Sequence, residues 1–271
     1  MSISLEYIKK NAHRYKRTSN SILYKKDDQL YKVFQRMSFK DATAKQIEYN
    51  YMIRNEVSPT IVLPTDIIRE TDGYYDYTVA GYEQPFVPSY TFQTCLKKNI
   101  PLDKKELIVN SLFKSLEEVN KYLVVGDINL ENLLFPKEKT DNNGYIIDLD
   151  FAKRLNSNIT MRSNYNIRGQ HSLIADYDTN TDIIKMFIST LSFFYKYNLE
   201  ELVLEPHFPT LDIIIDFLQK LENNGILMSY CKYLKDYYDK GLLIDQYLEI
   251  PSNYNIEKEI NHGISRLRNF K

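Results

Sequence analysis

Two stretches of this sequence decide the fold that it predicts: VVGDINLENLLF at Val124–Phe135 and YIIDLDFA at Tyr145–Ala152. The first carries Asp127 and Asn132 five residues apart, and leucines around them anchor the loop against an apolar interior. The second is a short apolar run that follows the turn residues DNNG and opens directly onto Asp148, as expected of a buried strand. The end of the first stretch and the start of the second are therefore predicted to pair as a β-hairpin.

These motifs resemble the catalytic loop and the metal-binding motif of the protein-kinase-like superfamily. The catalytic loop of that family carries HRD or HGD with an asparagine five residues after its aspartate, and this chain has VGD followed by Asn132. The metal motif DFG is DLD here, Asp148–Asp150, closer to the IDxD pattern of small-molecule and atypical bacterial kinases. The resemblance implies that Asp127 orients the acceptor hydroxyl and that Asn132 and Asp148 bind Mg²⁺. The alternative is that GD and NN mark surface turns with solvated carboxylates.

An upstream hairpin supplies a candidate lysine. The runs Ile22–Lys25 and Gln29–Phe34 alternate in polarity and are joined by KDD, which indicates two paired strands. Lys32 lies inside the second run, so its side chain projects from a strand and not from a turn. The resemblance makes Lys32 the catalytic residue that holds the phosphates of ATP. The alternative is an ordinary edge-strand lysine that faces water.

A helix is predicted from Asp41 to Asn55, because Asp41 can cap it and apolar residues recur at helical spacing. In the superfamily a glutamate of this helix pairs with the strand lysine and directs it at the phosphates. That resemblance makes Glu48 the third candidate catalytic residue, with Glu56 as a less favoured alternate. A glutamate that faces solvent on an amphipathic helix is the competing interpretation.

Strands are predicted from Thr60 to Tyr82, and the segment EQPFV after them would be a hinge between two lobes. Backbone groups at Pro85 and Val87 are the expected contacts for the adenine of ATP. Helices are predicted at residues 104–122, 181–195, 211–221 and 227–238 and near the C-terminus. The predicted fold class is α+β: a bilobal, protein-kinase-like fold with a small β-rich N-terminal lobe, residues 1–87, and a larger α-helical C-terminal lobe, residues 88–271.

One of these helices begins with TDIIKMFISTL, where Asp182 stands near the first turn. The resemblance implies that Asp182 braces the catalytic loop. An aspartate near a helix start is also an ordinary cap, and the two roles are compatible.

Composition agrees with one catalytic unit, since 271 residues with 43% hydrophobic side chains suffice for two lobes. A net charge of -1 gives no reason to expect a nucleic-acid partner. No stretch approaches the roughly 20 apolar residues of a membrane span, and no secretion signal is recognisable, so a cytoplasmic location is expected. Cys95 and Cys231 are read as reduced structural residues, and the four histidines show no metal-ligand spacing.

The resemblance implies transfer of the terminal phosphoryl group of Mg-ATP to a hydroxyl acceptor, and a protein Ser/Thr kinase is the preferred interpretation. Several departures keep other classes open. No glycine precedes Gly73, Asn129 stands where protein kinases carry a lysine, and no APE motif precedes Asp182. A small-molecule kinase of the aminoglycoside or sugar type is the first alternative, and a catalytically silent kinase-like binding module is the second. The basic residues between Asp150 and Asp182 suggest either a substrate platform or a solvated loop.

Overall fold

The computed structural model describes residues 4–35, 37–71 and 77–155, together with separate residues between Thr179 and Asn198. The helices expected at residues 211–221 and 227–238 and near the C-terminus, residues 156–178 of the basic segment before Asp182, and Cys231 lie outside the described residues. In the part of the chain that is described, no helix is long and apolar enough to cross a membrane.

Five antiparallel strands form the main sheet, in the order β1-β2-β3-β5-β4. Their bounds are β1 His13–Arg17, β2 Ser21–Lys26, β3 Gln29–Phe34, β4 Asp66–Thr71 and β5 Tyr77–Pro85. The predicted hairpin of β2 and β3 is confirmed, and Asp27 at its turn has a positive φ of 51°. Because β3 lies between β2 and β5, Lys32 belongs to a central strand and not to an edge.

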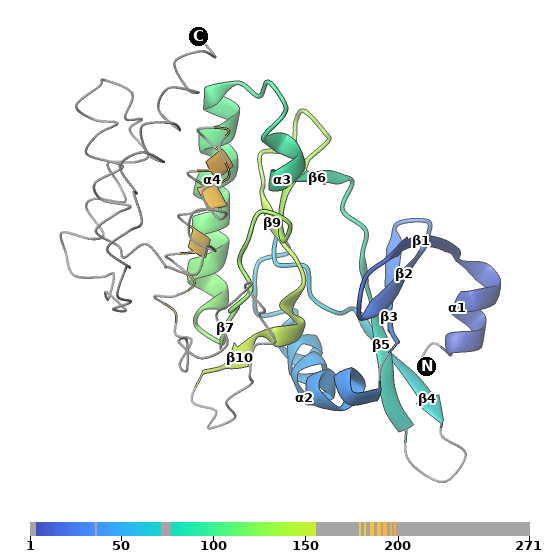
Figure 1. Ribbon diagram of the computed structural model, residues 1–271. Coiled ribbons are helices and arrows are strands. Elements are labelled where there is room, and N and C mark those ends of the chain that lie inside the picture. Colours follow the sequence, from blue (N-terminus) through green and yellow to red (C-terminus); the bar gives the residue numbers. More distant parts are fainter. Residues whose placement is uncertain are drawn as a thin grey trace, which may run out of the picture.

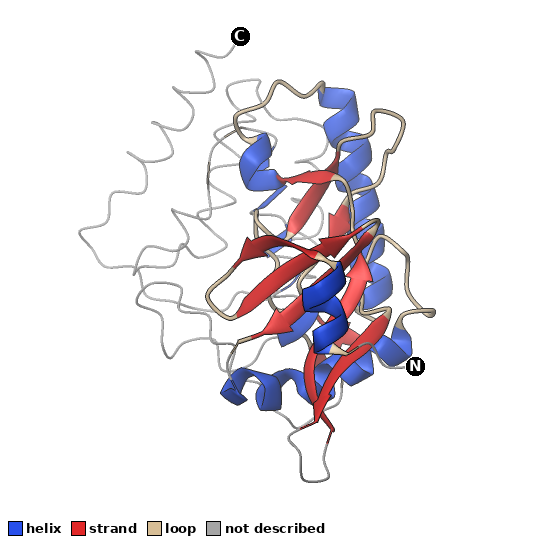
Figure 2. Cartoon of the chain, turned by 90° about the vertical axis from the view of Figure 1, so that its right-hand side faces the viewer, coloured by secondary structure: helices blue, strands red, loops and turns tan. Residues whose placement is uncertain are grey.

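Helices cover both faces of this sheet (Figure 1): α1, Leu5–Asn11, lies on one side and α2, Met37–Ile53, on the other. Neighbouring residues of a strand point to opposite faces, so each pair of adjacent apolar residues contributes to two cores. One core joins Ile47 of α2 to Phe34, Ile67, Val79 and Tyr82. The other joins Ile8 of α1 to Tyr31, Val33, Ile68 and Ala80. Figure 2 views the sheet from the side on which α1 crosses it.

After β5 the chain leaves the sheet and becomes mainly helical. The elements are β6 Ser89–Thr91, α3 Phe92–Cys95, α4 Leu102–Val119, β7 Leu123–Val124, β8 Leu133–Pro136, β9 Tyr145–Ile146, the 3₁₀ turn η1 Leu149–Phe151 and β10 Lys153–Arg154. Strands β6, β8 and β9 form one small sheet, and β10 pairs with β7. The predicted hairpin is confirmed, since Leu133 pairs with Ile146 and Leu134 with Tyr145.

The fold is thus a mixed α+β arrangement with an antiparallel sheet, as the sequence predicted at that level. Two local predictions need correction. The apolar run that begins at Thr60 is not a strand, because Ile61 makes only a single isolated bridge, to Ile146, before Pro64 and Thr65 lead into β4. Helix α2 begins at Met37 and ends at Ile53, a few residues earlier at each end than predicted.

Candidate functional site

Lys32 is the centre of a buried polar group. Its ammonium nitrogen lies 2.5 Å from Oδ1 of Asp148 and 2.7 Å from Oδ2 of Asp150, and its side chain is 11% exposed. Lys32 and Asp148 are 116 residues apart in the sequence, so only the fold brings them together. The interpretation of Lys32 as an edge-strand lysine facing water is therefore wrong.

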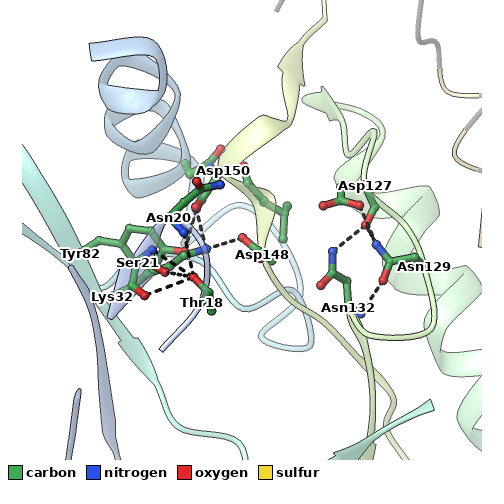
Figure 3. Close-up of polar contacts among 12 residues, drawn as sticks. Thr18, Asn20, Ser21, Lys32, Tyr82, Asp127, Asn129, Asn132, Asp148 and Asp150 are labelled. Atoms are coloured by element: carbon green, nitrogen blue, oxygen red, sulfur yellow. Dashed lines mark hydrogen bonds and ion pairs between the residues drawn. The ribbon is translucent and has the colours of Figure 1, made fainter. Parts of the chain in front are cut away.

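Asp148 reaches Lys32 because the backbone turns sharply at the end of β9. Its φ of 65° and ψ of 54° are left-handed, a conformation that aspartate tolerates better than most residues but that still carries strain. The turn η1 follows at once and points the carboxylates of Asp148 and Asp150 at the same ammonium group. Figure 3 shows Asp148 between Lys32 and the loop of Asp127.

Asp150 is the buried member of the pair, with a side chain 2% exposed against 37% for Asp148. The hydroxyl of Tyr82 donates to its Oδ1 at 2.7 Å. Its Oδ2 is buried and has the ion pair to Lys32 but no hydrogen bond of good geometry. The sequence alone indicated no role for Asp150 beyond its place in the DLD motif. A second acid two residues after a strand-end aspartate was the signal for it.

Glu48 does not pair with Lys32, which corrects that prediction. Its Oε1 lies 3.3 Å from Arg69 of β4, and its side chain is 43% exposed. Asn50 of the same helix faces the site instead, because its amide donates to the Leu149 carbonyl at 2.9 Å and accepts from Gln46 at 2.8 Å. Residues two apart on an α-helix point about 200° apart, so Glu48 faces away when Asn50 faces inward.

Glu56, the alternate acid, is not placed to pair with Lys32 either, because it lies beyond the end of α2 and is exposed. Among the side chains of α2 that the structure describes, residues 44–53, the amides of Gln46 and Asn50 face the DLD motif and Glu48 does not.

The loop between β7 and β8 holds Asp127 from two sides. The amide of Asn129 donates to Asp127 Oδ1 at 2.6 Å, and the amide of Asn132 donates to the Asp127 carbonyl at 2.9 Å. Asn129 also accepts from the backbone N–H of Glu131 and of Asn132, at 2.9 and 3.1 Å. Asn129 thus stabilises the loop at the position where a protein kinase would carry a lysine. The prediction of solvated turn carboxylates is wrong for Asp127, which is 9% exposed.

Asp182 holds the backbone of this loop at Val125 and Gly126. Its two carboxylate oxygens accept from the backbone N–H groups of Val125 and Gly126 at 2.6 and 2.7 Å, and its side chain is fully buried. Lys185, one helical turn later, donates to the Gly126 carbonyl at 2.6 Å. Gly126 has a φ of 74°, which favours glycine at the bend. The bracing contact inferred for Asp182 is therefore present.

The electrostatics of the buried group follow from its two acids and one amine. Burial lowers the pKa of Lys32, but the charges of Asp148 and Asp150 outweigh it and hold the pKa well above its ordinary value. Burial raises the pKa of Tyr82, and the charge of Asp150 adds to this, so the phenol stays a hydrogen-bond donor at neutral pH. With both carboxylates ionised the group has one negative charge more than it has positive charges, which favours a bound cation.

The donor set fits Mg²⁺. The Ile147 N–H donates to the Asn132 carbonyl at 3.0 Å, so Asn132 lies beside the residue that precedes Asp148. The side chains of Asn132 and Asp148 offer amide and carboxylate oxygens, and Mg²⁺ is usually bound through one or two protein oxygens with phosphates and water. Within the described ranges, no group of three or more His, Cys, Asp or Glu side chains is arranged to hold a metal without such help.

The expected adenine contacts lie where β5 ends. The Phe86 N–H donates to the Asp28 carbonyl at 2.8 Å, which continues the β3–β5 pairing and engages that amide. Contacts of the Pro85 and Val87 backbone with an adenine stay a prediction. The Val87 carbonyl also accepts from the Ser89 hydroxyl at 2.9 Å.

The turn between β1 and β2 contains no glycine and is held by hydrogen bonds within the turn. The hydroxyl of Thr18 accepts from the N–H groups of Ser21 and Asn20 at 3.0 and 3.4 Å, and the Thr18 N–H donates to the Ser21 carbonyl at 2.9 Å. Figure 3 draws these contacts beside Lys32. The backbone N–H groups of Asn20 and Ser21 are therefore engaged within the turn.

Comparison with known proteins adds no family to this picture. No protein-family model matches the sequence, and no curated protein is significantly similar to it.

Proposed function

We propose that this protein is an ATP-dependent phosphotransferase with a bilobal, protein-kinase-like fold, in which residues 1–87 form the nucleotide-binding lobe and residues 88–271 the catalytic lobe. The observation that carries the proposal is the convergence of Lys32 and Asp148 on one ion pair of 2.5 Å. The loop of Asp127, braced by Asp182, supports it independently. The candidate residues Lys32, Asp127, Asn132 and Asp148 follow one another along the chain in the same order as in the resembled family. A protein that binds no phosphate would not need all four side chains.

In the proposed reaction each side chain has a defined task. Lys32 binds phosphate oxygens, Asn132 and Asp148 hold Mg²⁺, and Asp127 accepts a hydrogen bond from the hydroxyl that attacks. Bound Mg²⁺ would neutralise charge that develops on the phosphates. Asp127 orients the acceptor more than it deprotonates it, because the proton leaves late when the transition state is loose. The backbone at Pro85 and Val87 would position the adenine.

Two classes of acceptor are considered for the proposed reaction. A protein hydroxyl is the first choice, as the sequence suggested. A small-molecule hydroxyl is the second, and two observations favour it: the DLD motif, and Asn129, which binds Asp127 at 2.6 Å where a protein kinase carries a phosphate-binding lysine. The turn at Thr18, whose hydroxyl already binds two amides, instead favours a module that binds nucleotide weakly or not at all.

Incubation with γ-labelled ATP and magnesium tests the proposal. The full chain, Asp148→Asn and Asp148→Ala would be compared, with Asp103→Asn as a matched control, because Asp103 is an exposed acid of the first turn of α4. Label that enters protein or a metabolite pool in the wild type and in Asp103→Asn, but not in the Asp148 variants, supports transfer. The destination of the label selects the acceptor class. Absence of both transfer and nucleotide binding would overturn the proposal.

A further inference from the structure

Lys32 is paired with two carboxylates in this structure, those of Asp148 and Asp150. In the proposed function only one of the two has to remain paired with Lys32. If Asp148 binds Mg²⁺, its carboxylate can no longer serve Lys32 alone. The phosphates that Lys32 would bind come and go with the nucleotide, so a second anion that is fixed in the protein keeps the buried ammonium paired and in place. In the resembled family the helix glutamate has this task. Here Glu48 lies 3.3 Å from Arg69 and is partly exposed.

We propose that Asp150 is the positioning residue for Lys32 and takes over the task of the helix glutamate. The inference rests on the proposed function. Asp150 Oδ2 lies 2.7 Å from Lys32 Nζ, and its side chain is almost fully buried, whereas Asp148 is the more exposed of the two acids. Asp148 is thus placed to meet a ligand, and Asp150 is placed behind Lys32.

Two neighbouring elements fix Asp150. The first is β5, where Tyr82 is the cross-strand partner of Lys32 and donates its hydroxyl to Asp150 Oδ1 at 2.7 Å. Asp150 therefore contacts both Lys32 and Tyr82, and the sheet fixes the positions of these two residues relative to each other. The second is α2, where Asn50 holds the Leu149 carbonyl at 2.9 Å and so restrains the backbone next to Asp150. Figure 3 shows Tyr82 and Asp150 on the Lys32 side of Asp148.

The matched pair Asp150→Asn and Glu48→Gln tests this assignment, since each removes one charge with little change of volume. Two measurements are made on the full chain. The first is steady-state transfer with Mg-ATP, where Asp150→Asn is expected to lower kcat about 100-fold, with a smaller change in KM, because Lys32 is misplaced. The second is the rate at which an amine-reactive acylating reagent labels Lys32 at fixed pH, read by peptide mass spectrometry.

The labelling rate is expected to rise several-fold in Asp150→Asn, because the loss of one carboxylate charge favours the neutral, reactive amine of Lys32, and to stay unchanged in Glu48→Gln. Tyr82→Phe removes only the hydroxyl that holds Asp150, so it should move both measurements in the same direction by less. If Asp150→Asn is not folded, as shown by the loss of cooperative unfolding, Tyr82→Phe provides the test in its place.

The outcomes separate the two proposals. A wild type that transfers phosphoryl groups, with an unchanged Asp150→Asn and an impaired Glu48→Gln, overturns the role of Asp150 alone. A wild type without transfer or nucleotide binding overturns the proposed function, and the Lys32 labelling rates then still decide whether Asp150 or Glu48 holds the lysine. Equal labelling in wild type, Asp150→Asn and Tyr82→Phe would refute the assignment.

Discussion

Asp127 owes its orientation to contacts that do not depend on its charge. Asn129 donates to its side chain and Asn132 to its carbonyl, so an asparagine at position 127 can keep the loop shape by presenting its amide oxygen to Asn129. We expect Asp127→Asn to lower the transfer rate about 10²–10⁴-fold, the usual contribution of such a group.

Nucleotide affinity should change little in that variant, because the proposed task of Asp127 is to orient the acceptor and not to bind the phosphates. Isothermal titration with a non-hydrolysable ATP analogue and magnesium measures the affinity, and the γ-label assay measures the rate. Equal losses in affinity and in rate would show that Asp127 shapes the nucleotide site, contrary to its proposed task.

Between elements, β3 and β5 approach each other closely at Gly81. A Cβ atom added at Gly81 would collide with the backbone carbonyl oxygen of Lys32, and backbone cannot move aside as a flexible side chain can. Gly81→Ala is therefore expected to lower the free energy of unfolding by about 1–3 kcal/mol or more, as overpacked cores do, and to impair transfer because Lys32 is displaced.

Urea unfolding and the γ-label assay measure the two effects. Thr78→Ala, on the same strand at a partly exposed position, is the control and should be nearly neutral. A stable, fully active Gly81→Ala protein would mean that the two strands are not packed as described.

Helix α4 carries a buried amine whose titration affects stability. Lys105 donates to the Phe193 carbonyl at 2.7 Å, and burial, assisted by the charge of Lys196, lowers its pKa to about 8 from an ordinary value of 10.5. Between these two values the unfolded chain binds more protons than the folded chain, so stability rises with pH through this window. Below about pH 8 both states are protonated and the contribution of Lys105 is constant.

Urea unfolding at pH 7.5 and 9.5 tests this dependence, and both values lie below the pH at which the raised pKa of Lys32 would cause a loss of stability. Lys105→Met should lose the increase between the two pH values. Lys114→Met, at an exposed position of the same helix, should keep it. The same increase in all three proteins would assign it to another group.

For the molecule as a whole, the proposed site joins residues from both the sheet and the helical part, so a ligand bound there should stabilise both. Mg-ATP at 100 times its Kd is expected to stabilise the native state by about 2.7 kcal/mol, or roughly 5 °C in Tm for a chain of this size. Calorimetry with and without a chelator measures it. An identical shift in excess chelator would contradict magnesium binding at Asn132 and Asp148.

Hydrophobic pattern predicted the elements that bury apolar residues on a regular period. The β2–β3 and β8–β9 hairpins and α4 carry that pattern, and the structure contains them. It missed β1, because the residues HRYKR are all exposed and form an edge strand with no apolar face. The pattern also predicted a strand in the run from Thr60, but the buried side chains of that run belong to a connecting segment.

By itself the sequence determined the candidates for the proposed site: Asp127, Asn132 and Asp148 stand in motifs with local spacing, and Lys32 stands in a run that alternates as a strand does. Only the tertiary structure decided how they pair. The sequence predicted Glu48 as the partner of Lys32, whereas the structure places Asp148 and Asp150 there and turns Glu48 toward Arg69. The reason is physical: periodicity fixes which residues of a helix share a face, but the direction in which that face points depends on packing against strands distant in the chain.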